Sequence, residues 1–301
     1  MKSVMAWKSK SYVLDKPDEL SAGLKQALNY HSDKVLFFAN KYENDPITAI
    51  HEIRKCFKRL RSIVSILYPL IPESSRYWNH FWRDCSRTLS AGRVACVRVD
   101  TIKVISEVPG EFKSLLDLAI ANRDEMLDSI QQCGVMTDLT AAIVQSKSKL
   151  TDLVPEDLSF FNLEKGLYLA YEKAKQQLDK ALFSKNPEDL HDLRKRCKKI
   201  QYHTELMSGL SPELKAYNRT ISLYTELLGQ YNDMQDIENW CRSSGEVSFS
   251  NDWNRMTAQL EKKKANLRNK ALLRISQLLK RDGSDYLELY TDLYYKLNEQ
   301  Q

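Results

Sequence analysis

A basic motif occurs twice in this chain of 301 residues, and the two copies align without a gap at an offset of 140, from His51 to His191. Residues 51–61 read HEIRKCFKRLR, and residues 191–201 read HDLRKRCKKIQ. A repeat of this length within one chain usually marks two similar structural units. We therefore expect two related halves, each containing one copy of the motif.

Each motif has an apolar side and a cationic side when it is drawn as an α-helix with ~100° per residue. In the first copy, Ile53, Phe57 and Leu60 fall on one side, and Arg54 and Lys58 fall on the other. The second copy repeats this arrangement. A helix of this kind buries its apolar side in a core and presents its cations elsewhere.

The charge of both motifs points to an anionic partner. Each copy holds five Lys or Arg residues and one acid. Like charges four residues apart, such as Arg54 and Lys58, destabilise a helix by roughly a few tenths of a kcal/mol. Solvated surfaces usually mix the two signs and avoid this repulsion. The alternative is a basic surface without any ligand, but the occurrence of the motif twice favours a ligand.

The rest of the chain predicts an all-α protein. It contains only 9 Gly and 8 Pro, and signals for β-strands are weak throughout. We expect two pseudo-symmetric halves that resemble four-helix bundles and face each other. The first half would span about 15–131, the second about 161–298, and residues 132–160 would connect them with short helical pieces. The periodicity and the breaks at Pro and Gly predict helices at about 20–41, 46–68, 73–90, 93–107, 111–131, 162–184, 187–209, 212–242, 252–281 and 284–298, with a loop at 243–251.

Composition excludes several classes of protein. The net charge is only +5, so the basic character is local to the motifs. Six cysteines form no CxxC pair and no Cys/His spacing typical of zinc, so we expect no metal site and no cofactor. Reduced, buried thiols are typical of the cytosol. No stretch approaches a signal peptide or the ~20 apolar residues of a membrane span, which favours a soluble cytoplasmic protein without a membrane partner.

At the repeated motif the chain resembles the CHAD (conserved-histidine α-helical domain) family. The signature of that family is a histidine followed by alternating basic and apolar residues, roughly H-x-L-R-x-x-x-R/K-R/K-L-R. The first copy matches it from His51 to Arg61. The second copy matches a form that ends in R-Y, from His191 to Tyr202, with Gln201 in place of the usual arginine.

The family also carries an L-G-x-x-R/N-D segment after each motif. Residues 228–233 match it well, whereas residues 89–94 keep Arg93 but have Val94 in place of the acid. We therefore predict that this segment packs differently in the two halves.

The resemblance covers about residues 15–298 and implies one CHAD-like domain that binds inorganic polyphosphate. It implies that the basic helices line a central pore or groove, and it suggests an association with intracellular polyphosphate granules. Some relatives also carry a triphosphatase domain, but no strand-rich region or E-x-E-x-K motif precedes the helices here. We therefore expect a binding protein with no catalytic residues.

Arginine pairs with phosphate oxygens through two parallel hydrogen bonds, and lysine contributes a point charge. We expect Lys25, Arg83, Arg87 and the basic helix Lys262–Arg274 to extend the site, and we leave out Arg196 because it falls towards the apolar side of its helix. The candidate residues for polyphosphate binding are His51, Arg54, Lys55, Lys58, Arg59, Arg61, Arg93, His191, Arg194, Lys195, Lys198, Lys199 and Tyr202.

The two motif histidines have two open interpretations. His51 and His191 could donate to phosphate, more strongly when protonated near about pH 6, or they could hydrogen-bond a neighbouring helix. The remaining three histidines have no counterpart in the repeat, and we expect them to be structural or exposed. They are His31, His80 and His203.

Two other functions compete with polyphosphate binding. An enzyme that hydrolyses or transfers phosphate would normally need metal-binding carboxylates beside the cations, and no acidic cluster accompanies Glu52 or Asp192. A single-stranded nucleic-acid binder would interleave aromatic and basic residues. The aromatic residues of segment 77–82 instead follow a helical spacing that predicts a place in the core, and they are Tyr77, Trp78, Phe81 and Trp82.

Overall fold

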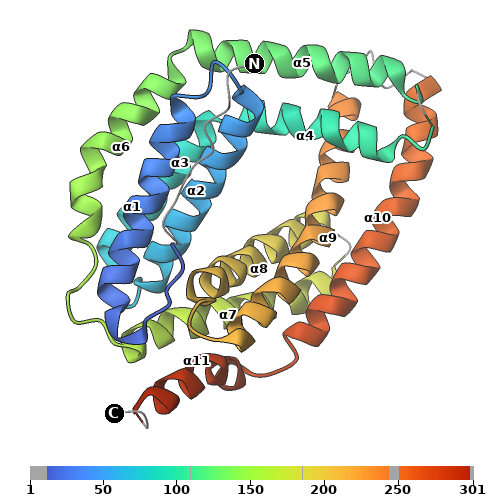
Figure 1. Ribbon diagram of the computed structural model, residues 1–301. Coiled ribbons are helices and arrows are strands. Elements are labelled where there is room, and N and C mark those ends of the chain that lie inside the picture. The colour runs from blue at the N-terminus through green and yellow to red at the C-terminus, as the bar shows by residue number, and fades with distance from the viewer. Residues whose placement is uncertain (1–11, 109, 185, 244–250, 299–301) are drawn as a thin grey trace.

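The computed structural model describes residues 12–108, 110–184, 186–243 and 251–298, which form eleven α-helices and contain no β-strand (Figure 1). A single 3₁₀ turn, η1 (Pro17–Glu19), precedes the first helix. The predicted all-α fold is therefore confirmed. The helices are α1 (Leu20–Ala39), α2 (Pro46–Ile66), α3 (Pro72–Thr88), α4 (Ser90–Ile105), α5 (Lys113–Gln132), α6 (Val135–Thr151), α7 (Phe160–Phe183), α8 (Pro187–Met207), α9 (Pro212–Ser243), α10 (Asn251–Leu278) and α11 (Gly283–Asn298).

The two motif helices, α2 and α8, begin in the same way. Proline occupies the first turn of each, where its missing N–H leaves no helical bond unmade. The preceding residue caps the helix with its side-chain oxygen: Asp45 accepts from the Thr48 N–H at 3.1 Å, and Asn186 accepts from the Glu188 N–H at 3.0 Å. Both helices are 21 residues long. The local sequence therefore starts both cationic helices in the same way, although Pro187 is one residue closer to its motif than Pro46 is.

Helix contacts occur in the same order in both halves of the chain. In the first half α1 packs on α2, α2 on α3, α4 on α5 and α1 on α6. In the second half α7 packs on α8, α8 on α9, α9 on α10 and α7 on α11. Helix α9 thus corresponds to α3 and α4 together. A symmetry axis relating the two halves stays a prediction, but the order of contacts agrees with two related halves.

Two segments differ from the sequence prediction. Residues 132–160 contain α6, a helix of 17 residues that packs on α1, so short helical pieces were the wrong prediction. Helices α3 and α4 are separated only by Leu89, whereas the sequence predicted a break of two residues at 91–92. Most of the loop predicted at 243–251 lies outside the described residues.

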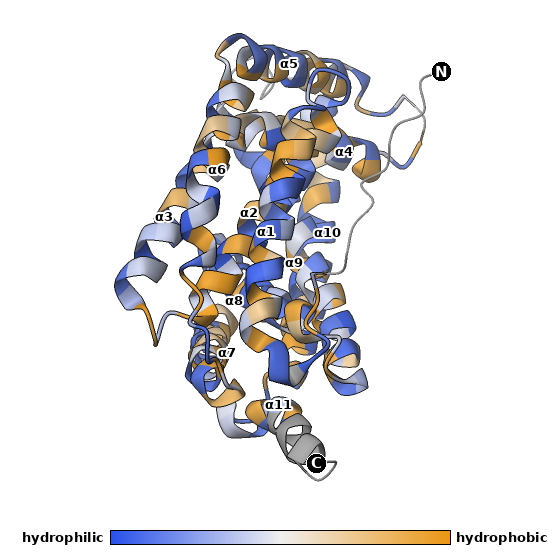
Figure 2. Cartoon of the chain, turned by 60° about the vertical axis from the view of Figure 1, so that its left-hand side comes forward, coloured by the Kyte–Doolittle hydropathy of each residue, from blue (hydrophilic) through white to orange (hydrophobic). Residues whose placement is uncertain are grey.

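Apolar residues form two clusters. The larger one unites the apolar sides of α2 and α8, where Ile53, Leu60, Leu193 and Ile200 are all fully buried. The smaller one lies between α4, α5, α9 and α10 and includes Ile102. Figure 2 shows hydrophobic and hydrophilic residues interspersed along the helices. Within the described ranges, no helix combines the length and the apolarity that a membrane span requires.

The predicted aromatic core of segment 77–82 is only partly correct. Trp78 and Trp82 are buried and stack on each other, with ring centroids 5.6 Å apart. Tyr77 is 63% exposed, so its assignment to the core was wrong. It lies one residue before Trp78 on α3, and a step of ~100° turns its side chain towards solvent. Cys56 and Cys197 are buried free thiols, as predicted.

Candidate anion-binding site

The two motif helices contact each other directly, and this contact brings their cations together. Lys58 of α2 lies close to Arg194 and Lys198 of α8. Burial and the neighbouring positive charges, Arg194 first among them, lower the pKa of Lys58 to about 7. Lys58 makes no hydrogen bond or ion pair with any residue that the structure describes. Its charge is therefore held next to other positive charges, and Asp233 is an acid near enough to interact with it.

A cavity of about 810 Å³ opens beside this contact, between α2, α3, α7 and α8. Eleven of its lining residues are basic, and one, Asp192, is acidic. The basic ones are Lys58, Arg61, Arg76, Arg83, Arg87, Lys173, Arg194, Lys195, Arg196, Lys198 and Lys199. The structure thus gathers cations from four helices around one space, and we call this surface the cavity face.

Several cations of the cavity face have only neutral partners. Lys198 donates to the side-chain oxygen of Gln201 at 2.8 Å, and Arg61 donates to that of Asn79 at 2.8 Å. Burial and, next, Arg194 lower the pKa of Lys198 to about 8. Burial and, next, Lys173 lower the pKa of Lys199 to about 8. Within the described residues, Lys58, Arg61, Lys173, Arg194, Arg196, Lys198 and Lys199 form no ion pair.

The remaining cations of the cavity face do form ion pairs. Arg76 pairs with Glu73, and both Arg83 and Arg87 pair with Asp84. Lys195 pairs with Asp192 at 2.8 Å and with Glu188 at 3.6 Å. These pairs involve exposed side chains, which contribute little energy and rearrange easily. An anionic ligand can therefore compete for these cations.

Seven of the thirteen predicted site residues line the cavity, and the other six do not. Those in the cavity are Lys58, Arg61, Arg194, Lys195, Lys198, Lys199 and Tyr202. Two arginines of α3 that were expected to extend the site, Arg83 and Arg87, also line the cavity. Those not in the cavity are His51, Arg54, Lys55, Arg59, Arg93 and His191.

Sequence reasoning missed three basic residues of the cavity. Arg196 was left out because of its wheel angle, but it is exposed and lines the cavity. A side chain this long can reach past the edge of its helix. Arg76 on α3 and Lys173 on α7 lie outside the motifs, and no sequence signal assigns them to the same space.

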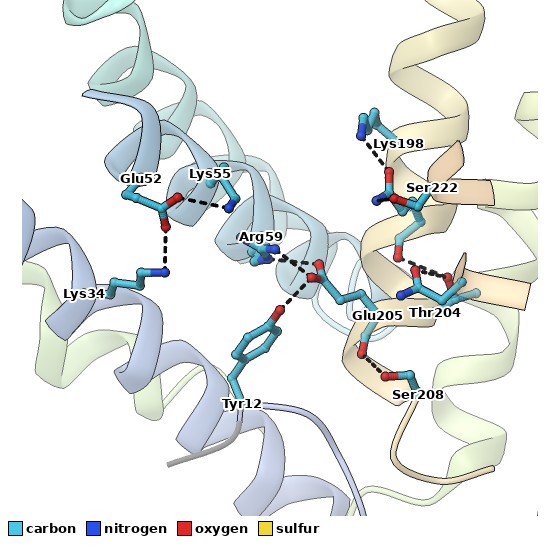
Figure 3. Close-up of polar contacts among 12 residues, drawn as sticks. Tyr12, Lys34, Glu52, Lys55, Arg59, Lys198, Thr204, Glu205, Ser208 and Ser222 are labelled. Atoms are coloured by element: carbon cyan, nitrogen blue, oxygen red, sulfur yellow. Dashed lines mark hydrogen bonds and ion pairs between the residues drawn. The ribbon is translucent and has the colours of Figure 1, made fainter. Parts of the chain in front are cut away.

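Two motif cations that lie outside the cavity, Lys55 and Arg59, are neutralised by carboxylates (Figure 3). Glu52 accepts from Lys55 at 3.0 Å and from Lys34 at 2.7 Å. Arg59 donates two hydrogen bonds to Glu205, at 2.6 and 2.9 Å. Burial of Glu52 alone would raise its pKa, but the bonds from Lys34 and Lys55 lower it to about 2.

Of the two motif histidines, His191 contacts a neighbouring helix through a hydrogen bond, whereas His51 lies near Glu52 of its own helix. The Nδ1 atom of His191 lies 2.9 Å from the amide nitrogen of Asn232 on α9. Burial lowers the pKa of His191, and burial together with the charge of Arg93 lowers the pKa of His51 to about 4. The ring of His51 is therefore neutral near about pH 6 in the unliganded protein. The interhelical interpretation fits His191. Of the other histidines, His31 and His203 are buried and His80 is exposed.

The motif arginines Arg54 and Arg194 have different surroundings. Arg54 donates to the backbone carbonyl of Ser86 and, at 2.8 Å, to the hydroxyl of Ser90. Arg194 lies against Gly229, where a Cβ atom would come within 3.4 Å of its guanidinium. Among the described residues Arg194 has no hydrogen-bond partner, and its Nε is buried and unpaired.

The basic residues expected to extend the site beyond α3 lie elsewhere. Lys25 pairs with Glu156. On α10, Lys263 pairs with Glu107, and Lys264 pairs with Glu238. Lys264 thus connects α10 to α9, and the other two lysines connect a helix to a loop. In the described part of the chain, no group of three or more His, Cys, Asp or Glu residues is arranged to hold a metal ion.

Comparison with known proteins bears on the fold and the family of the chain. The profile of the CHAD domain matches residues 23–242. The crystal structure of the CHAD domain from the plant Ricinus communis is similar, with a TM-score of 0.59 and 16% identity over 91% of this chain and 96% of that one. PptA from Streptomyces chartreusis gives a TM-score of 0.60 and 14% identity over 88% of this chain and 100% of that one. No curated protein matches the chain. Because the profile covers more than half of its length, the chain belongs to the CHAD domain family.

Proposed function

We propose that this protein binds inorganic polyphosphate in the cavity face and does not hydrolyse it. One observation carries the proposal: seven cations of the cavity form no ion pair in the described residues, and only one acid lines the cavity with them. Holding unpaired cations together in partly buried positions is unfavourable unless an anion completes the site.

The residue types suit a phosphate chain. Arginines offer planar pairs of donors that match phosphate oxygens, and Arg61, Arg83, Arg87 and Arg194 line the cavity. Lysines add point charges between them. Tyr202 and Tyr68 supply part of the less polar wall. A linear polyanion would contact cations of four helices in turn and release its counter-ions, so its affinity should fall steeply with salt.

The chemistry of the side chains supports a binding role without catalysis. Hydrolysis or transfer of phosphate normally uses metal ions held by carboxylates or a positioned base. Asp192 stands alone in the cavity lining, and its carboxylate already accepts from Lys195. An association with polyphosphate granules belongs to the same proposal, because a folded module with one polyanion site can attach to such a surface.

The test is a titration of the purified protein with long-chain polyphosphate at two salt concentrations, with RNA as competitor and with release of free phosphate recorded. We expect salt-sensitive binding that RNA does not displace, and no phosphate release. Metal-dependent release would assign the protein to the enzymes instead. Preference for RNA would overturn the choice of ligand.

A further inference from the structure

The amine of Lys58 lies among cations at the wall of the cavity. Its Nζ atom makes no hydrogen bond or ion pair with the residues that the structure describes. The charged groups that act on it most come from four helices, α2, α4, α8 and α9. They are Arg54, Arg93, Arg194, Lys198 and, with the opposite sign, Asp233. The amine is therefore partly desolvated, crowded by positive charge and not committed to a protein partner.

Lys58 is the member of this group that can give up a proton. Arginine keeps its charge in proteins. Arg54 is held beside Lys58 by the carbonyl of Ser86 and, at 2.8 Å, by the hydroxyl of Ser90, so its charge stays in place. With its pKa lowered by burial and by Arg194 to about 7, about half of the Lys58 amines are neutral near about pH 7, against fewer than about one in a thousand for an ordinary lysine. A neutral amine is a nucleophile.

The space next to this amine suits a phosphate group. Arg194 has no hydrogen-bond partner among the described residues, and Lys198 donates to Gln201 with only one of its protons. Both can donate to phosphate oxygens beside Lys58. The cavity, about 810 Å³ in volume, also has room for a small organic group attached to that phosphate. An electrophile that carries a phosphate would therefore be held with its reactive atom near the amine.

We propose that Lys58 is a modification site, acylated by small acyl phosphates that the cavity binds through their phosphate group. The lone pair of Nζ attacks the acyl carbon, and the bond from this carbon to the bridging oxygen breaks. The electrons of that bond leave with the phosphate, which Arg194 and Lys198 hold and which takes up the proton that the nitrogen loses. The products are an amide on Lys58 and hydrogen phosphate. The modification goes beyond polyphosphate binding, and it rests on the proposed function only in that the cavity accepts phosphate groups.

Lys195 provides a comparison within the same cavity. Its Nζ atom lies 2.8 Å from the carboxylate of Asp192 and 3.6 Å from that of Glu188, so it must leave both before it can attack. Its side chain is nevertheless 54% exposed, and Lys58 is the less exposed of the two. Access alone would make Lys195 react first, whereas the surroundings of the two amines favour Lys58.

The first test treats the purified protein with acetyl phosphate at about pH 7 and follows acetylation of each lysine by peptide mass spectrometry. Lys58 should react about tenfold or more faster than Lys195, because far more of its amine is neutral and free. It should also react about tenfold or more faster than Lys262, an exposed lysine on α10 outside the cavity. A rate at Lys195 or Lys262 equal to that at Lys58 would overturn the assignment.

A reagent without phosphate separates guidance by the cavity from reactivity of the amine. With the N-hydroxysuccinimide ester of acetic acid, the preference for Lys58 over Lys262 should be smaller by about fivefold or more, since nothing holds this reagent beside Lys58. An equal preference with both reagents would overturn acyl phosphates as the substrates. Excess inorganic phosphate should protect Lys58 from acetyl phosphate, and long-chain polyphosphate should do the same. Protection by phosphate but not by polyphosphate would contradict the proposed function and support the modification site.

The last test concerns the effect of the modification on binding. Acetylation removes the charge of a lysine. Treatment to about one acetyl group per chain should therefore lower the affinity for polyphosphate about tenfold. Lys58→Arg keeps the charge but has no amine to acylate, so the same treatment should change its affinity less than about twofold. An equal loss in this variant would show that the acetyl group that matters lies elsewhere and would overturn the proposal.

Discussion

Arg54 and Arg194 occupy the same place in the repeat, yet Arg54 hydrogen-bonds to the protein and Arg194 has no hydrogen-bond partner among the described residues. The cause lies in the helix that each one faces. In the first half α3 ends at Thr88, and its last carbonyls have no partner within the helix. Arg54 donates to one of them, the carbonyl of Ser86, and so acts as a C-terminal cap. In the second half α9 continues without a break, and Arg194 finds no free carbonyl.

A single side chain accompanies this difference. Ser90 accepts from Arg54, whereas its counterpart Gly229 offers no hydroxyl and leaves room for the guanidinium of Arg194. Duplicated sequence therefore does not mean duplicated function. The first motif arginine stabilises a helix junction, and the second faces the cavity next to Lys58. The predictions below test this division, starting with the cations that the two halves share.

The largest effect is expected from reversing one charge in each half. Lys58→Glu combined with Lys198→Glu should abolish polyphosphate binding, a loss of more than about a hundredfold, because both changes replace attraction by repulsion at the centre of the site. The helical content measured by circular dichroism should stay the same. Unchanged affinity would show that the site lies elsewhere.

The next effect separates the two arginines. Arg194→Ala should lower polyphosphate affinity about thirtyfold, through loss of a charged hydrogen bond of ~2 kcal/mol, with little change in the free energy of unfolding. Arg54→Ala should instead lower the free energy of unfolding by about 1–3 kcal/mol, because the Ser86 carbonyl loses its charged donor. Urea titration and binding measured on both variants would check this. If both variants lost the same polyphosphate affinity and had the same free energy of unfolding, the proposed difference between the two arginines would be contradicted.

A smaller effect is expected from pH. The free protein holds Lys58 with a pKa of about 7 and Lys198 with a pKa of about 8, and a bound polyanion raises both. Binding therefore takes up protons, so affinity should fall as the pH rises from about 7 to about 9, by at most about tenfold per unit for each proton. Isothermal titration in two buffers of different ionisation enthalpy would count the protons. Lys58→Arg should flatten the profile, since arginine stays charged.

The smallest effect is expected from giving the second half the serine of the first. Gly229→Ser places a hydroxyl beside Arg194, and a Cβ there would sit at 3.4 Å, which a side chain tolerates. A hydrogen bond from the guanidinium to this hydroxyl, contributing ~1 kcal/mol net, would hold Arg194 in place and lower polyphosphate affinity about fivefold. Gly229→Ala, which adds the Cβ without the hydroxyl, serves as the control. An equal loss in both variants would point to crowding instead of capture.

The sequence was sufficient to predict most of the fold. The offset of 140, the prolines at the starts of α2 and α8 and the helical spacing of apolar residues all act locally, so they can be read along the chain. The departure at Val94 also correctly indicated a difference between the two trailing segments. The sequence prediction missed α6 because Gly134 and Pro155 lie near the ends of residues 132–160. Both residue types are typical of connecting segments, so the helix between them was not predicted.

The site was predicted less completely, because its division depends on contacts between distant segments. A helical wheel shows that Arg59 and Lys199 are both cationic, but it does not show that Glu205 lies 146 residues away and pairs with the first of them. Likewise Lys173 and Arg76 carry no motif, and only the packing of α7 and α3 places them beside the same cavity. Which cations are free is a property of their neighbours in space.

The smaller apolar cluster has a consequence for how the chain assembles. It takes Val99 and Phe112 from the first half and Ile237 and Met256 from the second, and the larger cluster is shared as well. Neither half can bury these residues alone. A chain cut between the exposed residues Glu156 and Asp157 would give two pieces that each keep a strip of apolar side chains in water. The two pieces should fold only when they associate, and the rate of folding should therefore depend on the concentrations of both.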